Sequence, residues 1–216
     1  MRPVNDLKEV DIESMTVALT GDGHWEHEIL KALAERYNGN ENVLLIPIPV
    51  ALLGHGNRRT GRFSGLSALQ AIKTYISKYR IKRYLFLVDK EHIRNTEDTS
   101  TELEASVREM GFSLPHTEPL AKQAFLVRCK VGSHDIVIHT VISGEEKCIE
   151  EDIAKLVNLE WNIDIEPKKW VIRSVLRQRG TNLFSFVRNA ASANLTQALS
   201  DLAAAFESME EEIRHS

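Results

Sequence analysis

Cysteine is scarce in this chain of 216 residues. Only Cys129 and Cys148 are present, with no Cys-x-x-Cys spacing and no histidine pair beside either of them. This pattern argues against both a disulfide framework and a structural zinc site. We therefore expect both thiols to be reduced, with Cys129 in the core of a β-strand.

Long hydrophobic runs are also missing. The longest, residues 43–53, has eleven residues and contains two prolines, which is too short to cross a bilayer. The first residues have neither the charges nor the length of a signal peptide. The sequence therefore predicts a cytoplasmic protein without a membrane partner.

Acidic residues are absent from residues 42–88, although the net charge of the chain is -4. That stretch carries eight positive charges, at Arg58, Arg59, Arg62, Lys73, Lys78, Arg80, Lys82 and Arg83. Residues 167–200 form a second basic block without an acid. Two such blocks in an acidic chain indicate surfaces for a polyanion, such as nucleic acid or a nucleotide, although solvated helix faces would give the same pattern.

Strand and helix patterns alternate over the first half of the chain. Short β-type runs occupy residues 16–20, 43–53 and 84–88, and helical patterns occupy residues 24–37, 66–79 and 99–110. This order predicts an α/β fold with a central parallel sheet flanked by helices. The hydrophobic content of 43% is sufficient for one large core or two small ones.

The pattern changes after Gly111. Residues 125–130 and 135–142 are β-rich and joined by a short turn, which predicts a hairpin at the edge of the sheet. Helical patterns follow over residues 146–161, 169–179 and 194–213. We therefore expect an α/β domain over residues 1–144 and a helical C-terminal extension, residues 145–216, packed on it.

Two of the predicted strands stop abruptly at carboxylates. The first is followed by Asp22, Gly23 and, one helical turn later, Glu26, and another ends at Asp89 with Glu91 two residues on. The carboxyl ends of strands are where open α/β sheets bind ligands. Clustered carboxylates there suit Mg²⁺ or Mn²⁺, provided that the backbone stays extended between Asp89 and Glu91. Helix capping by Asp22 is the alternative that requires no metal.

These two motifs resemble the TOPRIM domain of topoisomerases, primases and the overcoming-lysogenization-defect family of nucleases. In that family the first strand ends in Glu-Gly, often followed by a further acid, and the third ends in Asp-x-Asp. The resemblance covers residues 15–120, with Asp22 in place of the Glu and Glu91 in place of the second Asp. It implies a TOPRIM-like fold, a catalytic role for Asp22 assisted by Glu26, and a metal held by Asp89 and Glu91.

The loop over residues 54–65 is a further candidate site. It contains four glycines and three arginines between a strand and a helix, so it can approach a phosphate closely and present paired donors. The sequence predicts phosphate binding by Arg58, Arg59 and Arg62, with a surface loop that has no ligand as the alternative.

Two functional hypotheses follow from these residues. The first is a nuclease that uses Mg²⁺ or Mn²⁺ and clustered carboxylates to act on the phosphodiester bonds of nucleic acid. The second is a Rossmann-like sensor or interaction module that binds a nucleotide without catalysis. Convergence of the acids on one ion would favour the first hypothesis.

Overall fold

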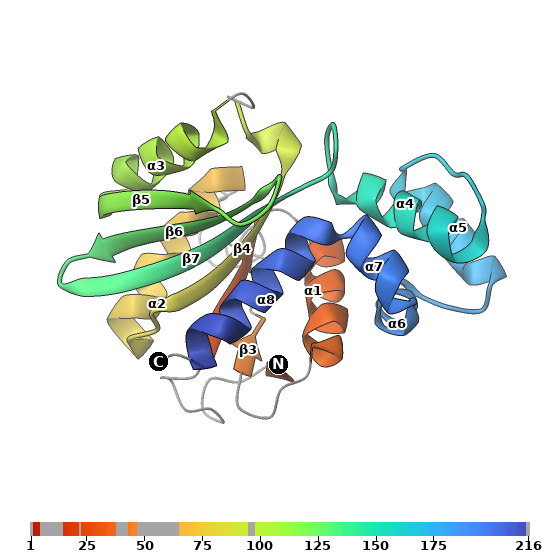
Figure 1. Cartoon of the computed structure of the whole chain (residues 1–216), viewed down its shortest axis with the longest axis horizontal. Helices are drawn as coiled ribbons and strands as arrows, with labels where there is room; N and C mark the ends of the chain where they lie inside the picture. Colours follow the sequence, from red (N-terminus) through yellow and green to blue (C-terminus); the bar gives the residue numbers. More distant parts are fainter. Residues whose placement is uncertain are drawn as a thin grey trace, which may run out of the picture.

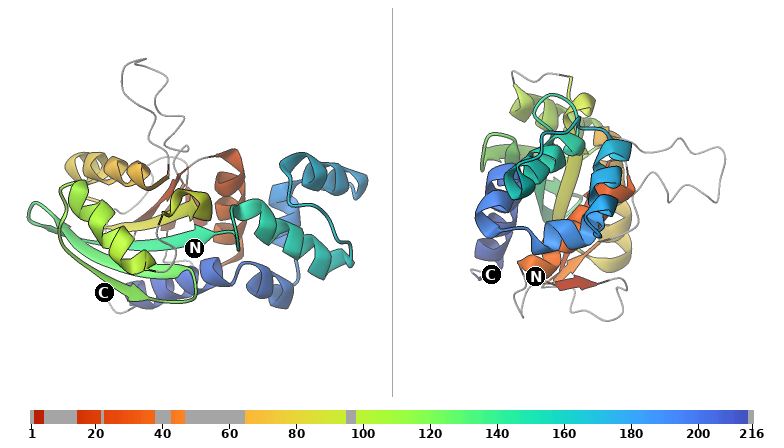
Figure 2. Two further views of the ribbon diagram at one scale, coloured as in Figure 1. Left: turned by 90° about the horizontal axis from the view of Figure 1, so that it is seen from above. Right: turned by 90° about the vertical axis from the view of Figure 1, so that its right-hand side faces the viewer.

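The computed structural model describes residues 2–4, 15–21, 23–37, 43–46, 65–94 and 98–214. In these ranges the protein has an α/β fold, with a mixed open sheet between two layers of helices (Figures 1 and 2). The strands lie in the order β1-β3-β2-β4-β7-β6-β5. Their bounds are β1 Arg2–Val4, β2 Met15–Thr20, β3 Val43–Leu45, β4 Arg83–Asp89, β5 Ser113–Pro119, β6 Ala124–Val131 and β7 His134–Ser143.

The helices fall into those that alternate with the strands and those that follow the last strand. The first group contains α1 His24–Arg36, α2 Ala71–Tyr79, α3 Thr99–Glu109 and two short 3-10 helices, η4 Gly65–Gln70 and η5 Lys90–His92. The second group contains α4 Ile149–Trp161, α5 Lys169–Gln178, α6 Leu183–Asn189, α7 Ser192–Ala198 and α8 Ser200–Arg214.

The centre of the sheet is parallel, as the alternation of strands and helices predicts. Strand β2 pairs in parallel with β3 on one side and with β4 on the other. This confirms the predicted pairing for the described residues, whereas residues 47–53 of the expected second strand lie outside them. The carboxyl ends of β2 and β4 consequently lie at the same edge of the sheet.

The hairpin of β6 and β7 is antiparallel, as predicted, but its expected position at the edge of the sheet is wrong. Strand β7 pairs in parallel with β4 from Val137 to Ser143, and β5 adds a further strand outside β6. The burial of β7 explains this placement, because its last six residues are all buried, whereas β5 has no buried residue. An interior strand has both faces covered, and an edge strand tolerates exposed polar side chains.

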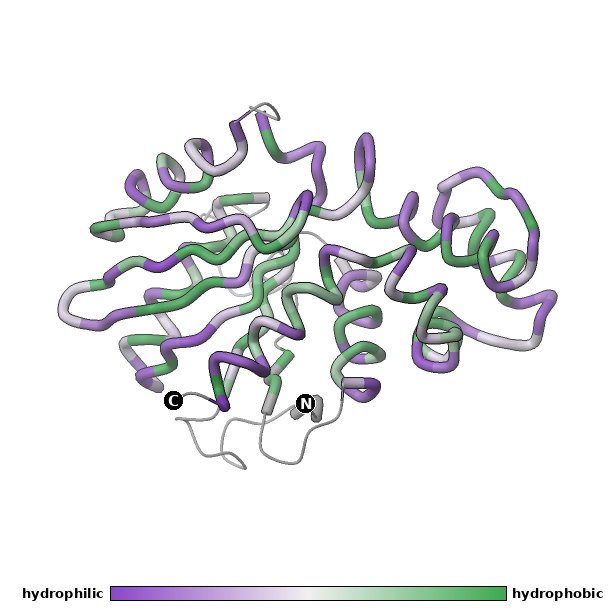
Figure 3. The backbone as a smooth tube through the Cα atoms, viewed as in Figure 1, coloured by the Kyte–Doolittle hydropathy of each residue, from purple (hydrophilic) through white to green (hydrophobic). Residues whose placement is uncertain are grey.

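Each face of the sheet has its own hydrophobic core, because successive side chains of a strand point to opposite faces. Leu85 and Leu87 of β4 pack toward α1 and the C-terminal helices. Tyr84, Phe86 and Val88 pack toward η4, α2 and α3. Figure 2 shows α2 and α8 on opposite sides of the sheet, and Figure 3 shows the apolar colouring of the central strands.

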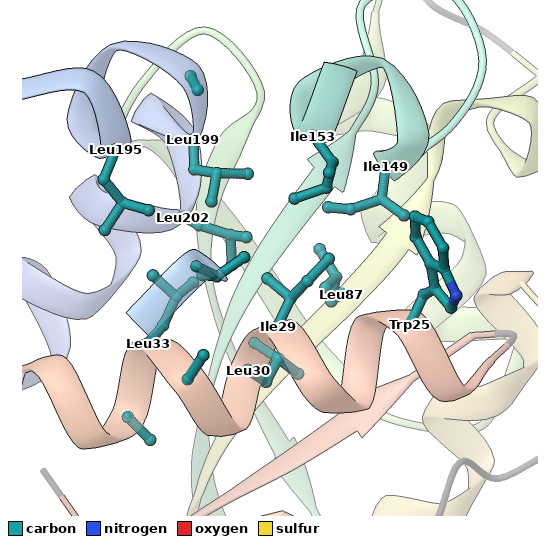
Figure 4. Close-up of a cluster of buried hydrophobic side chains, with 14 of the residues drawn as sticks. Trp25, Ile29, Leu30, Leu33, Leu87, Ile149, Ile153, Leu195, Leu199 and Leu202 are labelled. Atoms are coloured by element: carbon teal, nitrogen blue, oxygen red, sulfur yellow. The ribbon is translucent and has the colours of Figure 1, made fainter. Parts of the chain in front are cut away.

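Helix α1 joins the sheet to the C-terminal helices. Its residues Trp25, Ile29 and Leu33 recur every fourth position, which places them on one side of the helix. Figure 4 shows this side facing Leu87 of β4 and apolar residues of α4 and the α7–α8 region. At the other end of α1, the guanidinium of Arg36 donates to the carbonyls of Arg188 and Ala190 and to the Ser192 hydroxyl.

Apolar residues of the C-terminal helices belong to the same hydrophobic core as α1 and β4. Helices α4, α5, α6 and α7 project beyond the sheet, and α8 turns back across its face (Figure 1). The single helix expected over residues 194–213 is divided into α7 and α8 at Leu199. We call α4–α7 the helical lobe. None of the helices formed by the described residues combines the length and the apolar composition that crossing a bilayer requires.

Candidate functional site

The candidate site lies where the parallel strands end. Asp89 is the last residue of β4 and pairs in register with Ser143, the last residue of β7. Glu26 lies in the first turn of α1, which follows β2, and Glu150 lies in the first turn of α4, which follows β7. We call the three carboxylates of Glu26, Asp89 and Glu150 the acidic edge.

Asp89 is a rigid member of the acidic edge. Its side chain is only 6% exposed. The carboxylate oxygen Oδ1 accepts a hydrogen bond of 2.7 Å from the Ser143 hydroxyl and one of 3.0 Å from the backbone N–H of Ile149. These bonds hold the loop between β7 and α4 against β4, and they place a negative charge at the positive end of α4.

Glu26 is buried without this kind of support. The residue is 2% exposed, and neither of its carboxylate oxygens has a hydrogen-bond partner on another of the described residues. The carboxylate lies over Gly23, since a Cβ atom there would stand 2.8 Å from Glu26 Oε2. A buried carboxylate without partners is costly, so it indicates a place for a group that the protein itself does not supply.

The electrostatics of Glu26 follow from this position. The pKa of Glu26 is raised from 4.5 to about 7, chiefly by burial. A hydrogen bond from its own backbone N–H and the charge of Lys169 act to lower this pKa, and the charges of Asp89 and Glu150 act to raise it. Asp89 and Glu150 thus lie close enough to Glu26 for their charges to act on it. With a pKa near 7, Glu26 is able to exchange a proton at neutral pH.

Glu150 brings a cation to the edge. Its Oε1 lies 2.9 Å from the Nζ of Lys169, the first residue of α5. Burial tends to raise the pKa of Glu150, but hydrogen bonds from the Cys148 side chain and from Lys169 hold that pKa below its ordinary value. Burial tends to lower the pKa of Lys169, but Glu150, Glu26 and Asp89 raise it above its ordinary value. Lys169 therefore stays charged beside the carboxylates.

Glu91 pairs with a lysine. The backbone does not stay extended after Asp89, because residues 90–92 form the 3-10 helix η5. The Glu91 carboxylate is 40% exposed and lies 3.4 Å from the Nζ of Lys147, and the Glu91 backbone N–H donates to the Lys147 carbonyl. The structure thus brings Glu26 and Asp89 together and pairs Glu91 with a lysine, so a metal-binding role for Glu91 stays a prediction.

Two of the predicted groups cannot be placed. Asp22 lies outside the described residues, as do Arg58, Arg59 and Arg62. Across the described ranges, no group of three or more His, Cys, Asp or Glu side chains is arranged to hold a metal ion. The acidic edge nevertheless gathers three carboxylates, with the ammonium group of Lys169 beside them.

Glu150, Lys169 and Ser143 are the members of the site that the sequence patterns do not identify. Glu150 belongs to an acidic stretch after the hairpin, and Lys169 lies near the start of the second basic block. The separation of acidic and basic stretches is thus the only sequence signal for these two residues. It does not specify which acidic side chain pairs with which basic one. Only the position of α4 after β7 and the packing of α5 on α4 do so.

Comparisons with protein-family models, with curated proteins and with solved structures find no match to this chain. The residues of the acidic edge and their geometry therefore carry the functional conclusion by themselves.

Proposed function

We propose that the acidic edge binds Mg²⁺ or Mn²⁺ and that the protein uses it to cleave the phosphodiester bonds of nucleic acid, as a TOPRIM-like nuclease. The observation that supports this most strongly is the Glu26 carboxylate, which is buried and has no hydrogen-bond partner on another of the described residues. Its position at the carboxyl end of a parallel sheet is where such folds bind ligands.

The proposed ligands are of the chemical kind that a divalent cation takes. Glu26 and Asp89 supply hard oxygen ligands, which Mg²⁺ and Mn²⁺ prefer. The negative charge of these carboxylates is also of the right sign for a cation. Asp22, one turn before Glu26 in the chain, is the proposed third contributor, and Glu91 would have to leave Lys147 to join them.

Each residue has a distinct part in the proposed reaction. When bound, the cation supplies Lewis-acid polarisation of a phosphate oxygen. Asp89 is held in a fixed orientation by Ser143 and the N-terminus of α4, which keeps a ligand in place without reorganisation. Lys169 offers a positive charge beside the edge to an incoming phosphate. Asp22 takes the general acid/base role that the resemblance implies.

A cleavage assay tests this proposal. The parent protein is incubated with single- and double-stranded oligonucleotides, with and without Mg²⁺ or Mn²⁺. We expect metal-dependent cleavage that falls by about a hundredfold in Glu26→Gln and Asp89→Asn, because each change removes a charged oxygen ligand. Glu28→Gln is the matched control, since Glu28 lies on the same helix but is exposed.

The controls define what would overturn the proposal. Thermal melts without metal should show that each variant is folded, so that lost activity reflects lost chemistry. A parent protein that cuts neither substrate with either metal would contradict the proposed nuclease. So would cleavage by Glu26→Gln at the rate of Glu28→Gln.

A further inference from the structure

Helix α5 presents an aromatic ring and positive charges on one exposed side. Trp170, Arg173 and Arg177 recur at spacings of three and four residues, so they share a side of the helix. Trp170 is 70% exposed, which is unusual for so large an apolar side chain. Among the described residues no ion pair neutralises Arg173 or Arg177, and residues 167–200 contain no acid. We call these three residues the α5 stripe.

The α5 stripe begins at the acidic edge. Lys169, which precedes Trp170, pairs with Glu150. One turn further along, the guanidinium carbon of Arg173 lies 5.6 Å from the centre of the Trp25 ring. Trp25 immediately precedes Glu26. The stripe therefore leads from the carboxylates outward along the helical lobe, whose outer turns are largely hydrophilic (Figure 3).

The chemistry of the stripe suits a single-stranded polynucleotide. An exposed indole ring stacks on a base, and arginine side chains pair with the phosphates that follow. The stacking needs an unpaired base, because the faces of paired bases in a duplex are covered by their neighbours. A membrane surface fits less well, since Ile172 and Leu176 of α5 are buried inside the lobe and Trp170 is the only large apolar side chain of this helix that is exposed.

We propose that the α5 stripe binds single-stranded nucleic acid, with Trp170 stacked on a base and with Arg173 and Arg177 paired with phosphates. The inference rests on the proposed function in one respect, namely that the strand bound along α5 continues to the acidic edge as the substrate. Binding itself requires no metal.

Binding is measured by fluorescence anisotropy with labelled oligothymidylate, and with its duplex with oligodeoxyadenylate, in EDTA. We expect Trp170→Ala to weaken binding of the single strand about tenfold, the lower part of the range for loss of one base stack. Binding of the duplex should change less. A plot of log affinity against log salt concentration should become less steep by about 0.7 in Arg177→Gln. This is the change in slope expected for the loss of one phosphate contact in a single strand.

Two substitutions are matched controls. Leu114→Ala removes the other large apolar side chain that is exposed among the described residues. Lys130→Gln removes a positive charge, paired with Asp135, near the end of β6 and the turn to β7. Both should bind like the parent. Trp170 is exposed, so its substitution should leave the thermal melt unchanged.

Two results would overturn the inference. One is that Trp170→Ala and Leu114→Ala bind the single strand equally well. The other is that the protein binds vesicles rich in phosphatidylserine through Trp170 but does not bind the oligonucleotide. Failure of the proposed function is distinguishable from both. In that case the single strand binds through Trp170 in EDTA, but neither Mg²⁺ nor Mn²⁺ leads to cleavage.

Discussion

The parent protein should lose roughly 3 kcal/mol of its free energy of unfolding, through Glu26, as the pH rises from below 4.5 to above 7 without divalent cations. Replacing Glu26 by glutamine should abolish this loss. The reason is the pKa of Glu26, which burial raises from 4.5 to about 7 in the folded protein. Below pH 4.5 the carboxyl group holds its proton in both states. As the pH rises toward 7 the unfolded chain releases the proton and the folded protein retains it, so stability falls. Above about pH 7 the loss is complete.

Urea unfolding at a series of pH values in EDTA measures this difference. Glu26→Gln should lose less stability than the parent between pH 4.5 and pH 8, and Glu28→Gln, exposed on the same helix, should follow the parent. Burial also raises the pKa of Asp152 to about 7, but that group titrates equally in the proteins compared. Identical pH profiles of the parent and Glu26→Gln would show that Glu26 is not a buried acid.

Replacing Phe206 by alanine should lower the free energy of unfolding by about 3 to 5 kcal/mol, the usual cost of truncating a fully buried phenylalanine. Phe206 lies on the inner side of α8 and is completely buried. Its ring stacks on Tyr37, just after α1, with the ring centres 5.2 Å apart. The substitution would leave a cavity where α8 and the end of α1 meet on the sheet.

Glu207→Ala is the matched control for Phe206→Ala, because the neighbouring Glu207 is exposed. It should change the free energy of unfolding by no more than about 0.5 kcal/mol. Urea denaturation of the three proteins at one pH gives both values. A cost below about 1 kcal/mol for Phe206→Ala would show that α8 does not pack on the sheet as described.

The first half of the fold could be predicted because its signals are local. The spacing of Trp25, Ile29 and Leu33 specifies a helix without reference to the rest of the chain, and the apolar run that ends at Asp89 specifies a buried strand. Strand β5 has no such pattern, since its residues are exposed or half-buried and include two prolines. The pairing of β7 with β4 joins residues about fifty positions apart, and no local spacing encodes such a contact.

The acidic edge was predictable to the same extent. Asp89 and Glu26 could be identified because an acid at a strand end or in the first turn of the next helix reaches the edge of the sheet. Glu91 is two residues from Asp89, but the 3-10 turn of η5 directs it to Lys147. Glu150 and Lys169 reach the edge only because α4 and α5 pack there, which depends on contacts between distant parts of the chain.

Direct titration with Mn²⁺ tests the central claim, that the buried Glu26 carboxylate is a cation ligand. Electron paramagnetic resonance of free Mn²⁺ reports uptake by the parent, Glu26→Gln and Glu28→Gln at neutral pH, and competition with Mg²⁺ shows whether the two ions share the site. We predict saturable uptake by the parent and by Glu28→Gln, reversed by Mg²⁺, and none by Glu26→Gln. No uptake by the parent, or equal uptake by all three proteins, would contradict the claim.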